Sequence, residues 1–512
     1  MDSEDMILND RNKAGPELKI GLEIHCQLTF LHTKLFCGCL SNYRNSAPND
    51  NTCPICLGLP GTLPLLNKRA VEFASMICLA FNCSIPEKIS FYRKNYFYPD
   101  LPKNYQTTQY NSYELSSIGY EGSIEFVGDS KSKTDDLKNS EERTKIRITR
   151  VQLEEDPGKI TYEEDKSAAN NYSLIDYNRA GVSLVEIVTE PDFSSPIAVR
   201  IFLNEIVNLF EYLGVTDPSL EGSVRCDVNV SVGGGKKVEI KNISSFKEVE
   251  KSIYYEITRQ KTLIMHSIDV KPETRHWDEK RKVTVAARSK EEEEEYRYFP
   301  EPDIPRIILG SKFVSRVRTS MPELPIERLK RYIEVYKITE HTAKILVNDK
   351  RISDFFEESL VYHKSPIEIS NWIVNELLTK INEKDRQGLT DHNTKGLDIL
   401  TISPKQVAEM AKLVEIKSLN RTTAREIFDK SIETGTSPLK LIETLEIENI
   451  SDEKSIVKVI QEILSSQPQL IEQSKNNPNT INYILGLIMK ETKGRVNPQI
   501  ALRLIKESLE DI

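Results

Sequence analysis

The sequence lacks a long apolar run. No window of the 512 residues approaches the roughly 20 consecutive apolar residues that a transmembrane helix requires. The first 19 residues contain no apolar or arginine-rich leader and instead carry Asp2, Glu4, Asp5 and Asp10. Since 38% of the residues are hydrophobic, the chain has enough apolar material for packed cores in roughly two to four domains. We therefore expect a soluble protein of the cytosol, with no membrane contact.

Cysteine and net positive charge are also scarce. Eight cysteines in so long a chain are too few for a disulfide-dense secreted scaffold. The formal charge of −9 and the pI near 5.6 argue against non-specific binding of polyanions by the whole molecule, so any contact with RNA must be local. Four cysteines are scattered, and their simplest interpretation is buried thiols: Cys26, Cys78, Cys83 and Cys226.

The other four cysteines form two close pairs. Cys37 and Cys39 are followed, after 13 intervening residues, by Cys53 and Cys56. Two thiolate pairs on two tight turns supply the four ligands of a tetrahedral zinc ion, and a site without histidine or an open position is typical of structural zinc. The spacing therefore predicts a closed structural zinc site, with four unliganded thiols as the alternative.

Residues 19–305 have the pattern of a sheet domain. Short runs of β-type alternation are separated by Gly, Pro and Asn, which predicts a large antiparallel sheet. Two helices interrupt it, one at 67–81 and one that runs to residue 213 from Ser195 as N-cap and Pro196 at the first helical position. A polar stretch at 128–142 has no periodicity and predicts a mobile loop or plain solvated surface. The clearest strands are expected at 145–153, 184–189, 224–232 and 237–240.

After the prolines at 300–305 the pattern changes to amphipathic helices, with a polar, linker-like stretch at 382–393. Basic residues gather near the end of the chain, at Lys490, Lys493, Arg495, Arg503 and Lys506. We therefore expect an α+β protein whose parts are a disordered N-terminus at 1–18, the sheet domain at 19–305, a helical domain at 306–395 and a helical tail domain at 396–512.

The stretch 21–28 has a strict alternation of polar and apolar residues. As a β-strand it places Glu23, His25 and Gln27 on one face and four apolar side chains on the other. A carboxylate and an imidazole two residues apart on one strand project to the same side, which allows them to share a metal ion or a proton. The alternative is a solvated strand with an ordinary surface histidine.

Carboxylates that could join Glu23 and His25 occur in three later strand-like segments. Taken singly, each is a surface carboxylate, but together with one imidazole such oxygen ligands suit Mg²⁺ or Mn²⁺ far better than zinc. The sequence thus indicates a metal-dependent phosphate site. The acidic residues are Glu154, Glu155 and Asp156 in one segment, Glu186 in the second and Asp227 in the third.

The segment 93–106 interleaves cations and aromatic residues, and two prolines fix an extended path. Such a segment can hold a phosphate or a nucleoside, with Lys or Arg carrying the charge and Tyr stacking. Packing or a turn is the alternative interpretation.

Together these motifs resemble the B subunits of aspartyl/glutamyl-tRNA(Asn/Gln) amidotransferases. The likeness covers nearly the whole chain and includes the end of the tail at 489–498. The motifs that carry it, in chain order, are Gly-Leu-Glu-Ile-His from residue 21, the cysteine pairs with Leu-Gly-Leu-Pro-Gly after them, Arg-Lys-Asn-Tyr-Phe-Tyr-Pro-Asp-Leu-Pro-Lys from 93, Glu-Glu-Asp-x-Gly-Lys from 154, Asp-Tyr-Asn-Arg-Ala-Gly from 176, Gly-Ser-x-Arg-Cys-Asp-Val-Asn-Val-Ser from 222, Glu-Thr-Arg-x-Trp-Asp from 273 and Tyr-Arg-Tyr-Phe-Pro-Glu-Pro-Asp from 296.

The resemblance implies a cytosolic, Mg²⁺-dependent enzyme subunit with a cradle-like catalytic domain and two helical domains. It would use ATP to phosphorylate the side-chain carboxylate of Glu mischarged on tRNA(Gln), or of Asp on tRNA(Asn), and ammonia would then displace the phosphate. The reaction is that of an ATP-dependent ligase. A non-catalytic scaffold that only binds the mischarged tRNA is the alternative.

The resemblance also implies roles for single residues. Glu23, His25, Glu155 and Glu186 would surround the magnesium ion and Asp227 would lie near it. Nucleotide phosphates would be held by Lys94, Arg179 and Arg225, and the reaction itself would depend on Glu23, His25, Lys94, Glu155 and Asp227. The basic cluster of the tail would bind tRNA. Some relatives lack the four cysteines, so zinc would be structural and dispensable to the reaction.

Partners are implied as well, because the chain has no amidase signature and no evident Cys/His glutaminase arrangement. Ammonia would come from an amidase-type A subunit, and a small C subunit would complete a heterotrimer. The chain departs from the family at Gln152, where His is common, and at Ser183, which replaces a common Pro. A paralogous E subunit carries an inserted domain in its second half, whereas the segment 277–297 of this chain contains no inserted domain, which favours the B subunit. The substrate would be mischarged tRNA(Gln), mischarged tRNA(Asn) or both.

Overall fold

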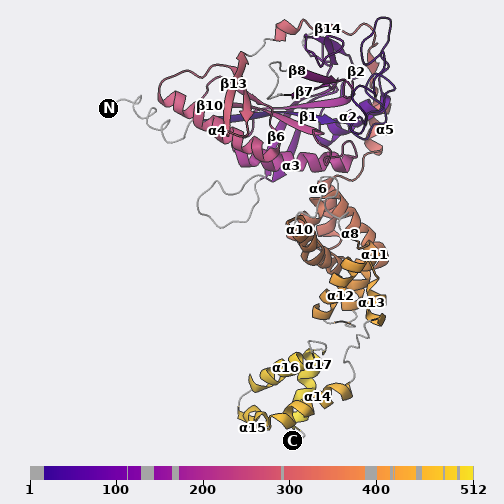
Figure 1. Cartoon of the computed structure of the whole chain (residues 1–512), viewed down its shortest axis with the longest axis vertical. Coiled ribbons are helices and arrows are strands. Elements are labelled where there is room, and N and C mark those ends of the chain that lie inside the picture. The colour runs from indigo at the N-terminus through magenta and orange to yellow at the C-terminus, as the bar shows by residue number, and fades with distance from the viewer. Residues whose placement is uncertain are drawn as a thin grey trace. The chain divides into compact units, whose positions relative to one another are not determined.

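The computed structural model describes residues 17–111, 114–127, 143–163, 172–289, 293–386, 401–415, 419, 421–444, 453–476, 479–492, 496 and 498–510 (Figure 1). The loop expected at 128–142 and residues 1–16 of the expected N-terminal segment lie outside this part of the chain. The chain divides into two compact units, Met1–Leu324 and Pro325–Ile512, which are described separately below.

The first unit is built around an eight-stranded sheet in the order β13-β12-β11-β10-β1-β9-β6-β5. Strand β1 lies in its interior, between β9 and β10, although these strands follow it in the sequence by more than 150 residues. The expected α+β fold is confirmed. The strands span Leu18–Gln27 (β1), Gly119–Val127 (β5), Arg143–Glu155 (β6), Ser183–Thr189 (β9), Val224–Val232 (β10), Val238–Lys241 (β11), Glu273–Asp278 (β12) and Val283–Ser289 (β13).

One pair of neighbouring strands departs from the antiparallel sheet that we expected. Strands β11 and β12 are parallel, and the helix α4 (Phe246–Met265) lies between them in sequence. A parallel pair needs a crossover of a dozen or more residues, and a helix of this length supplies it. The sheet is therefore mixed, with antiparallel pairing between all its other neighbouring strands.

Helices cover the apolar face of the sheet. The helices α2 (Lys68–Ala80), α3 (Pro196–Leu213) and α4 share one core with Ile20, Leu22 and Ile24 of β1, each at most 1% exposed. Both helices expected from the sequence are present: the side chain of Asn67 caps α2, and Ser195 caps α3 with proline in its first turn. Figure 1 shows α3 and α4 on one side of the sheet, which leaves the opposite, polar face for other elements.

In the described part of the chain, three small sheets accompany the large one. The first joins β14 (Phe299–Pro300), β3 (Tyr92–Asn95) and β4 (Tyr105–Thr108), and β4 packs against β6 of the large sheet. The others pair β15 (Ile307–Ile308) with β2 (Lys88–Ile89), and β7 (Lys159–Glu163) with β8 (Tyr172–Asp176). A short 3-10 helix, Glu293–Tyr296, precedes β14. Through β3 and β4, the segment 93–106 therefore runs beside the large sheet.

The first compact unit extends to Leu324 and includes a helix after the last strand. This helix, α5 (Ser311–Thr319), packs against α2. The apolar side of α5 completes the same core, since Val317 is buried there.

The second unit is helical. Its helix α11 packs against α8 and α9, whereas α14, α16 and α17 share a separate core, so α11 does not pack as part of that terminal core. The expected linker at 382–393 begins as the end of α10, and residues 387–393 lie outside the described part. Among the described helices of either unit, none is long and apolar enough to cross a membrane. The helices are Pro325–Glu334 (α6), Glu340–Val347 (α7), Lys350–Tyr362 (α8), Pro366–Asn371 (α9), the π-helix Trp372–Leu377, Leu378–Arg386 (α10), Pro404–Glu415 (α11), Arg421–Thr434 (α12), Pro438–Thr444 (α13), Glu453–Ser466 (α14), Gln469–Asn476 (α15), Asn479–Glu491 (α16) and Pro498–Glu510 (α17).

Candidate active site

The polar face of the large sheet gathers side chains from its central strands. In the register of the sheet, His25 of β1 lies opposite Glu186 of β9 and opposite Arg225 of β10. Glu23 lies opposite Asp227 of β10. Residues directly opposite one another on antiparallel strands project to the same face, so strand pairing alone brings these five side chains together.

Glu23, His25 and Glu186 form a cluster whose ligand atoms all lie within 4.8 Å of one another. The Nε2 atom of His25 is 3.6 Å from Oε2 of Glu186 and 3.8 Å from Oε1 of Glu23. Glu154 of β6 adds a further carboxylate, with Oε1 4.0 Å from the same nitrogen. Carboxylate oxygens and one imidazole are ligands that fit Mg²⁺ or Mn²⁺. The cluster therefore has the composition and the spacing of a hard-metal site.

The charges of this cluster depend on one another. Burial alone would lower the pKa of His25, but the carboxylates around it, with Glu186 foremost, raise this pKa to about 9. Burial and the charge of Glu186 raise the pKa of Glu154 to about 7 and also raise that of Glu23. Burial opposes ionisation of Glu186 too, yet His25 and Arg150 lower its pKa. The site thus concentrates negative charge that a bound cation would neutralise.

Glu155, which the family resemblance places at the metal, lies outside this cluster. Its carboxylate forms an ion pair with Lys103 and accepts a hydrogen bond of 2.8 Å from the backbone N–H of Thr107. The neighbouring Glu154 is the residue that faces His25. The structure therefore unites three of the four predicted magnesium ligands and offers Glu154 in place of the fourth.

The course of β6 explains why Glu154 and not Glu155 faces the cluster. The register shifts between Ile148 and Arg150, so the strand has a bulge there. After the bulge, Gln152 lies opposite Glu186, and Glu154, two residues further, projects to the same face.

Lys94 of β3 supplies a cation beside the cluster. Its charge lowers the pKa of both Glu154 and Glu186, although in neither case is it the largest influence. Its Nζ atom is 4.7 Å from the ring centre of Tyr296 and 5.9 Å from that of Tyr96, within the range of cation–π attraction. Among the described residues no carboxylate lies within 4.0 Å of Lys94, so its ammonium has no ion-pair partner there.

The two arginines predicted to hold nucleotide phosphates both lie near Asp156. Nη2 of Arg225 is 2.9 Å from Oδ1 of this buried carboxylate, and Nε of Arg179 is 3.9 Å from Oδ2. Arg179 also donates to the two backbone carbonyls that follow Asp156. The Nε atom of Arg225 is buried without a partner among the described residues. Arg225 thus keeps a donor to offer at the polar face, whereas the described contacts of Arg179 organise the chain itself.

Asp227 lies beside the cluster but is paired. Its Oδ2 atom is 2.8 Å from Nζ of Lys241, which also lies 3.3 Å from Oε1 of Glu239. The charge of Asp227 contributes to the raised pKa of Glu23, although burial and Glu186 contribute more. Asp227 therefore lies beside the cluster of Glu23, His25 and Glu186, with its carboxylate paired to Lys241.

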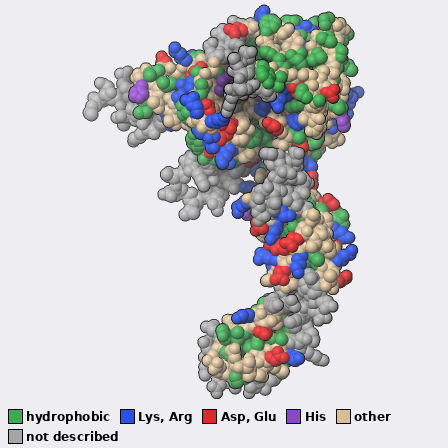
Figure 2. All heavy atoms as spheres, viewed as in Figure 1, with side chains coloured by type: hydrophobic (Ala, Val, Ile, Leu, Met, Phe, Trp, Pro, Cys, Tyr) green, Lys and Arg blue, Asp and Glu red, His purple; other side chains and the backbone are tan. Residues whose placement is uncertain are grey.

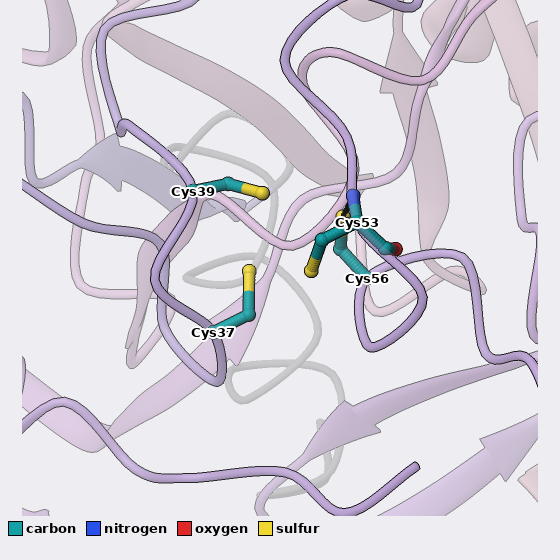
Figure 3. Close-up of side chains that lie close together, drawn as sticks. All are labelled: Cys37, Cys39, Cys53 and Cys56. Atoms are coloured by element: carbon teal, nitrogen blue, oxygen red, sulfur yellow. Dashed lines mark hydrogen bonds between the residues drawn. The ribbon is translucent and has the colours of Figure 1, made fainter. Parts of the chain in front are cut away.

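The four cysteines form a second cluster, away from the strands. Their sulfur atoms all lie within 4.8 Å of one another, and Figure 3 shows the side chains of Cys37 and Cys39 converging with those of Cys53 and Cys56 from two separate loops. The N–H of Cys53 donates to Sγ of Cys56 at 3.1 Å. A hydrogen bond from the Cys37 thiol lowers the pKa of Cys56 to about 5, while burial raises that of Cys39 to about 11. Four converging sulfurs fit a tetrahedral zinc ion.

The residues predicted to bind tRNA lie in the last two helices where they are described. Lys490 is exposed in α16, and Arg503 and Lys506 are exposed in α17. Lys493 and Arg495 lie outside the described part. Figure 2 shows acidic and basic side chains interspersed on the visible face of the second unit, without a broad patch of one sign.

Comparison with known proteins adds two kinds of likeness. A family model described as the GatB/GatE catalytic domain matches residues 18–315, and one described as the GatB domain matches residues 354–509. Proteins named as the B subunit of aspartyl/glutamyl-tRNA(Asn/Gln) amidotransferase are similar over 96% of the chain. Those of Saccharolobus solfataricus and Sulfolobus acidocaldarius are 40% and 42% identical over 99% of their own length. The protein of Thermotoga petrophila is 40% identical over 98% of its length.

Proposed function

The chain belongs to the GatB family, the B subunits of aspartyl/glutamyl-tRNA(Asn/Gln) amidotransferases, and from this premise we propose that the polar face of its sheet carries an ATP- and Mg²⁺-dependent step. It is a subunit of a tRNA-dependent amidotransferase. The observation that carries the proposal is the cluster of Glu23, His25 and Glu186 with the cation of Lys94 beside it.

The chemistry explains why such a site is needed. A carboxylate is a poor acyl donor because its leaving group would be an oxide. In the proposed reaction, an oxygen of the substrate's side-chain carboxylate attacks the γ-phosphorus of ATP, the bond to the β-phosphate oxygen breaks, and ADP leaves. Ammonia then attacks the carbonyl carbon of the acyl phosphate, inorganic phosphate leaves, and the side chain has become an amide. The substrates are Glu on tRNA(Gln), Asp on tRNA(Asn), or both.

The residues of the chain have separate tasks in this reaction. Glu23, His25 and Glu186 would hold the divalent ion, and Glu154 would take the place that the family resemblance gave to Glu155. A bound Mg²⁺ supplies positive charge that offsets the charge of the phosphates. Lys94 contacts the transferred phosphate, which its lack of an ion-pair partner in the described part of the chain supports.

Three further residues support the site. Arg225 offers its unpaired Nε atom, whereas Arg179 fixes the loop that holds Asp156 in place. The charge of Asp227, on the neighbouring strand β10, contributes to the raised pKa of Glu23. The rival proposal, a scaffold that only binds mischarged tRNA, needs none of these side chains on one face of the sheet.

The partners follow from the missing ammonia source. We infer a glutaminase of the amidase type as A subunit and a small C subunit, in a heterotrimer of the cytosol. The tail would hold tRNA through Lys490, Arg503 and Lys506, with Lys493 and Arg495 nearby in the sequence. The cysteine cluster would bind one zinc ion with a structural role, which the convergence of the four sulfurs supports.

The substitution Glu23→Ala tests the proposal. It removes a ligand from the cluster, so we expect ATP-dependent formation of amidated aminoacyl-tRNA to fall at least ~100-fold while tRNA binding persists. Glu125→Ala is a matched control, because Glu125 is an exposed carboxylate of β5 in the same sheet. Normal activity of Glu23→Ala in the complete complex would remove the metal assignment and favour the scaffold.

A further inference from the structure

Lys34 is a lysine whose side chain is wholly buried, with an exposed fraction of 0%. An ammonium group removed from water is costly unless an anion compensates it. Among the described residues, no carboxylate lies within 4.0 Å of Lys34. The compensating charge must therefore come from other groups around its Nζ atom.

Two contacts of the Lys34 ammonium are to the turn that carries the second cysteine pair. Its Nζ atom donates to the backbone carbonyl of Asn51 at 2.9 Å and to Sγ of Cys56 at 3.7 Å. The carbonyl is neutral, so the group that can carry a negative charge is the sulfur of Cys56. A thiolate at Cys56, unlike a thiol, carries the negative charge that compensates the buried ammonium group of Lys34.

The backbone holds Lys34 in this place from the other cysteine turn. Its N–H donates to the carbonyl of Cys39 at 2.9 Å, so the main chain of Lys34 belongs to the turn of the first pair while its side chain reaches the second. Gly181 lies next to both side chains: a Cβ atom there would be 3.7 Å from Cδ of Lys34 and 3.5 Å from Cβ of Cys56. Lys34 thus joins the two turns from inside the protein.

The charge balance of a loaded site gives this contact a function. Four thiolates around a divalent ion leave two negative charges in a largely buried place. One ammonium next to a ligand sulfur halves that excess, and its N–H donates toward the metal-bound sulfur as partners beyond the ligands commonly do. We propose that Lys34 is the countercation of the four-cysteine metal centre and sets its affinity for zinc. This rests on the zinc site proposed above.

The substitution Lys34→Met removes the charge and keeps the length of the side chain. We expect the zinc affinity of the full chain to fall about 10–100-fold, the usual cost of losing a partner beyond the ligands. The affinity is measured by competition with a chromophoric chelator. Lys68→Met is the control, because Lys68 is exposed at the start of α2, and it should keep the wild-type affinity.

A second variant separates charge from hydrogen bonding. Lys34→Gln keeps an N–H donor but has no charge, so it should lose zinc affinity as Lys34→Met does. If Lys34→Gln binds zinc as tightly as wild type, the charge is not needed and the proposal is wrong. A wild-type chain that binds no zinc would remove the centre and its countercation together, whereas amidation activity, tested through Glu23, is independent of either result.

Thermal unfolding gives a readout with opposite signs for the two roles of Lys34. With zinc bound, Lys34→Met should lower Tm, because the anionic centre loses its countercation. After zinc is stripped with a chelator, the same variant should have a Tm equal to or above that of wild type, because a buried ammonium without an anion is unfavourable. An equal loss of Tm with and without zinc would mean that Lys34 acts only through its bond to Asn51, and would overturn the proposal.

Discussion

The cysteine cluster and the carboxylate cluster of the first unit take their side chains from different kinds of structure. The four cysteines come from two turns within 20 residues of sequence, 37–39 and 53–56. Glu23 and His25 meet Glu186 only because β1 and β9 are neighbours in the sheet. Soft thiolates on local turns make a closed site, whereas hard carboxylates spread over a sheet face leave room for substrates.

Because of this difference, we expect the cysteine cluster to affect the stability of the protein and the carboxylate cluster to affect the reaction. A metal ion with four protein ligands has no open coordination position for a substrate, so loss of such a site should lower the free energy of unfolding. In the carboxylate cluster, burial and the charge of Glu186 raise the pKa of Glu23 and Glu154, an arrangement that destabilises the folded protein and is typical of functional sites. Substitutions in the two clusters should therefore have separable effects.

The largest effect is expected for Glu186→Gln. Removing this charge from the centre of the cluster should lower the rate of ATP-dependent amidation about 10³-fold, equivalent to about 4 kcal/mol, with zinc content unchanged. Glu155→Gln is the informative counterpart, because its carboxylate pairs with Lys103 outside the cluster, and it should retain more activity than Glu154→Gln. Activity is followed by separating amidated from unamidated aminoacyl-tRNA. The opposite order of the Glu154 and Glu155 variants would restore Glu155 as the ligand.

A smaller effect, and one on stability, is expected for Cys56→Ser. The variant should lose its zinc and, with free zinc about 100-fold above the dissociation constant, about 3 kcal/mol of unfolding free energy. Amidation measured well below the unfolding temperature should stay near the wild-type rate. Elemental analysis and denaturant titration check the first two effects, and Cys226→Ser, which changes a scattered cysteine, should keep its zinc. Loss of amidation in folded Cys56→Ser would show that the two clusters are not separable.

The smallest effect is expected at Asp156, a buried carboxylate that pairs with Arg225. Burial alone would raise its pKa, but Arg225 and Arg179 lower the pKa below the usual value. A carboxyl group with a depressed folded pKa stabilises the protein above its unfolded pKa of about 4, and this contribution disappears as the pH falls through the lower, folded value. Because both arginines are partly exposed, Asp156→Asn should cost only about 1–2 kcal/mol at neutral pH.

Denaturant titrations of wild type and Asp156→Asn from about pH 7 down to about pH 3 measure this contribution. The difference between the two proteins should shrink as the pH falls below about 4. A difference that stays constant over the whole range would mean that packing, and not the charge of Asp156, provides the stability.

Local signals in the sequence predicted local structure well. The ends of α2 and α3 follow from the side chains of Asn67 and Ser195, which accept hydrogen bonds from the first turn of each helix. The spacing of the four cysteines also predicts their cluster, because turns bring ligands together over short distances in the chain. The α+β class could likewise be read from the change of pattern near residue 305.

Features that depend on pairing between distant segments were less accessible. The parallel pairing of β11 with β12 depends on how α4 crosses the sheet, which no single segment encodes. The orientation of Glu154 did leave a signal in the sequence, since apolar Val151 and Leu153 alternate with polar Gln152 and Glu154. A motif shared with relatives favoured Glu155 instead. The burial of Lys34 had no signal, because the sulfur that its Nζ atom contacts belongs to a turn that comes later in the chain.

The interior place of β1 also affects how the protein can be made. Its two neighbours, β9 and β10, end about 160 and 200 residues after it, so a ribosome adding about 5–20 residues per second needs roughly 10–40 s to complete both. Until β9 is made, neither edge of β1 has its native partner in the sheet, and the edge that pairs with β10 lacks its partner for longer still. The strand that brings Glu23 and His25 to the site is thus synthesised first among the strands of the sheet but paired late. We therefore expect the nascent chain to bind chaperones that shield unpaired strands.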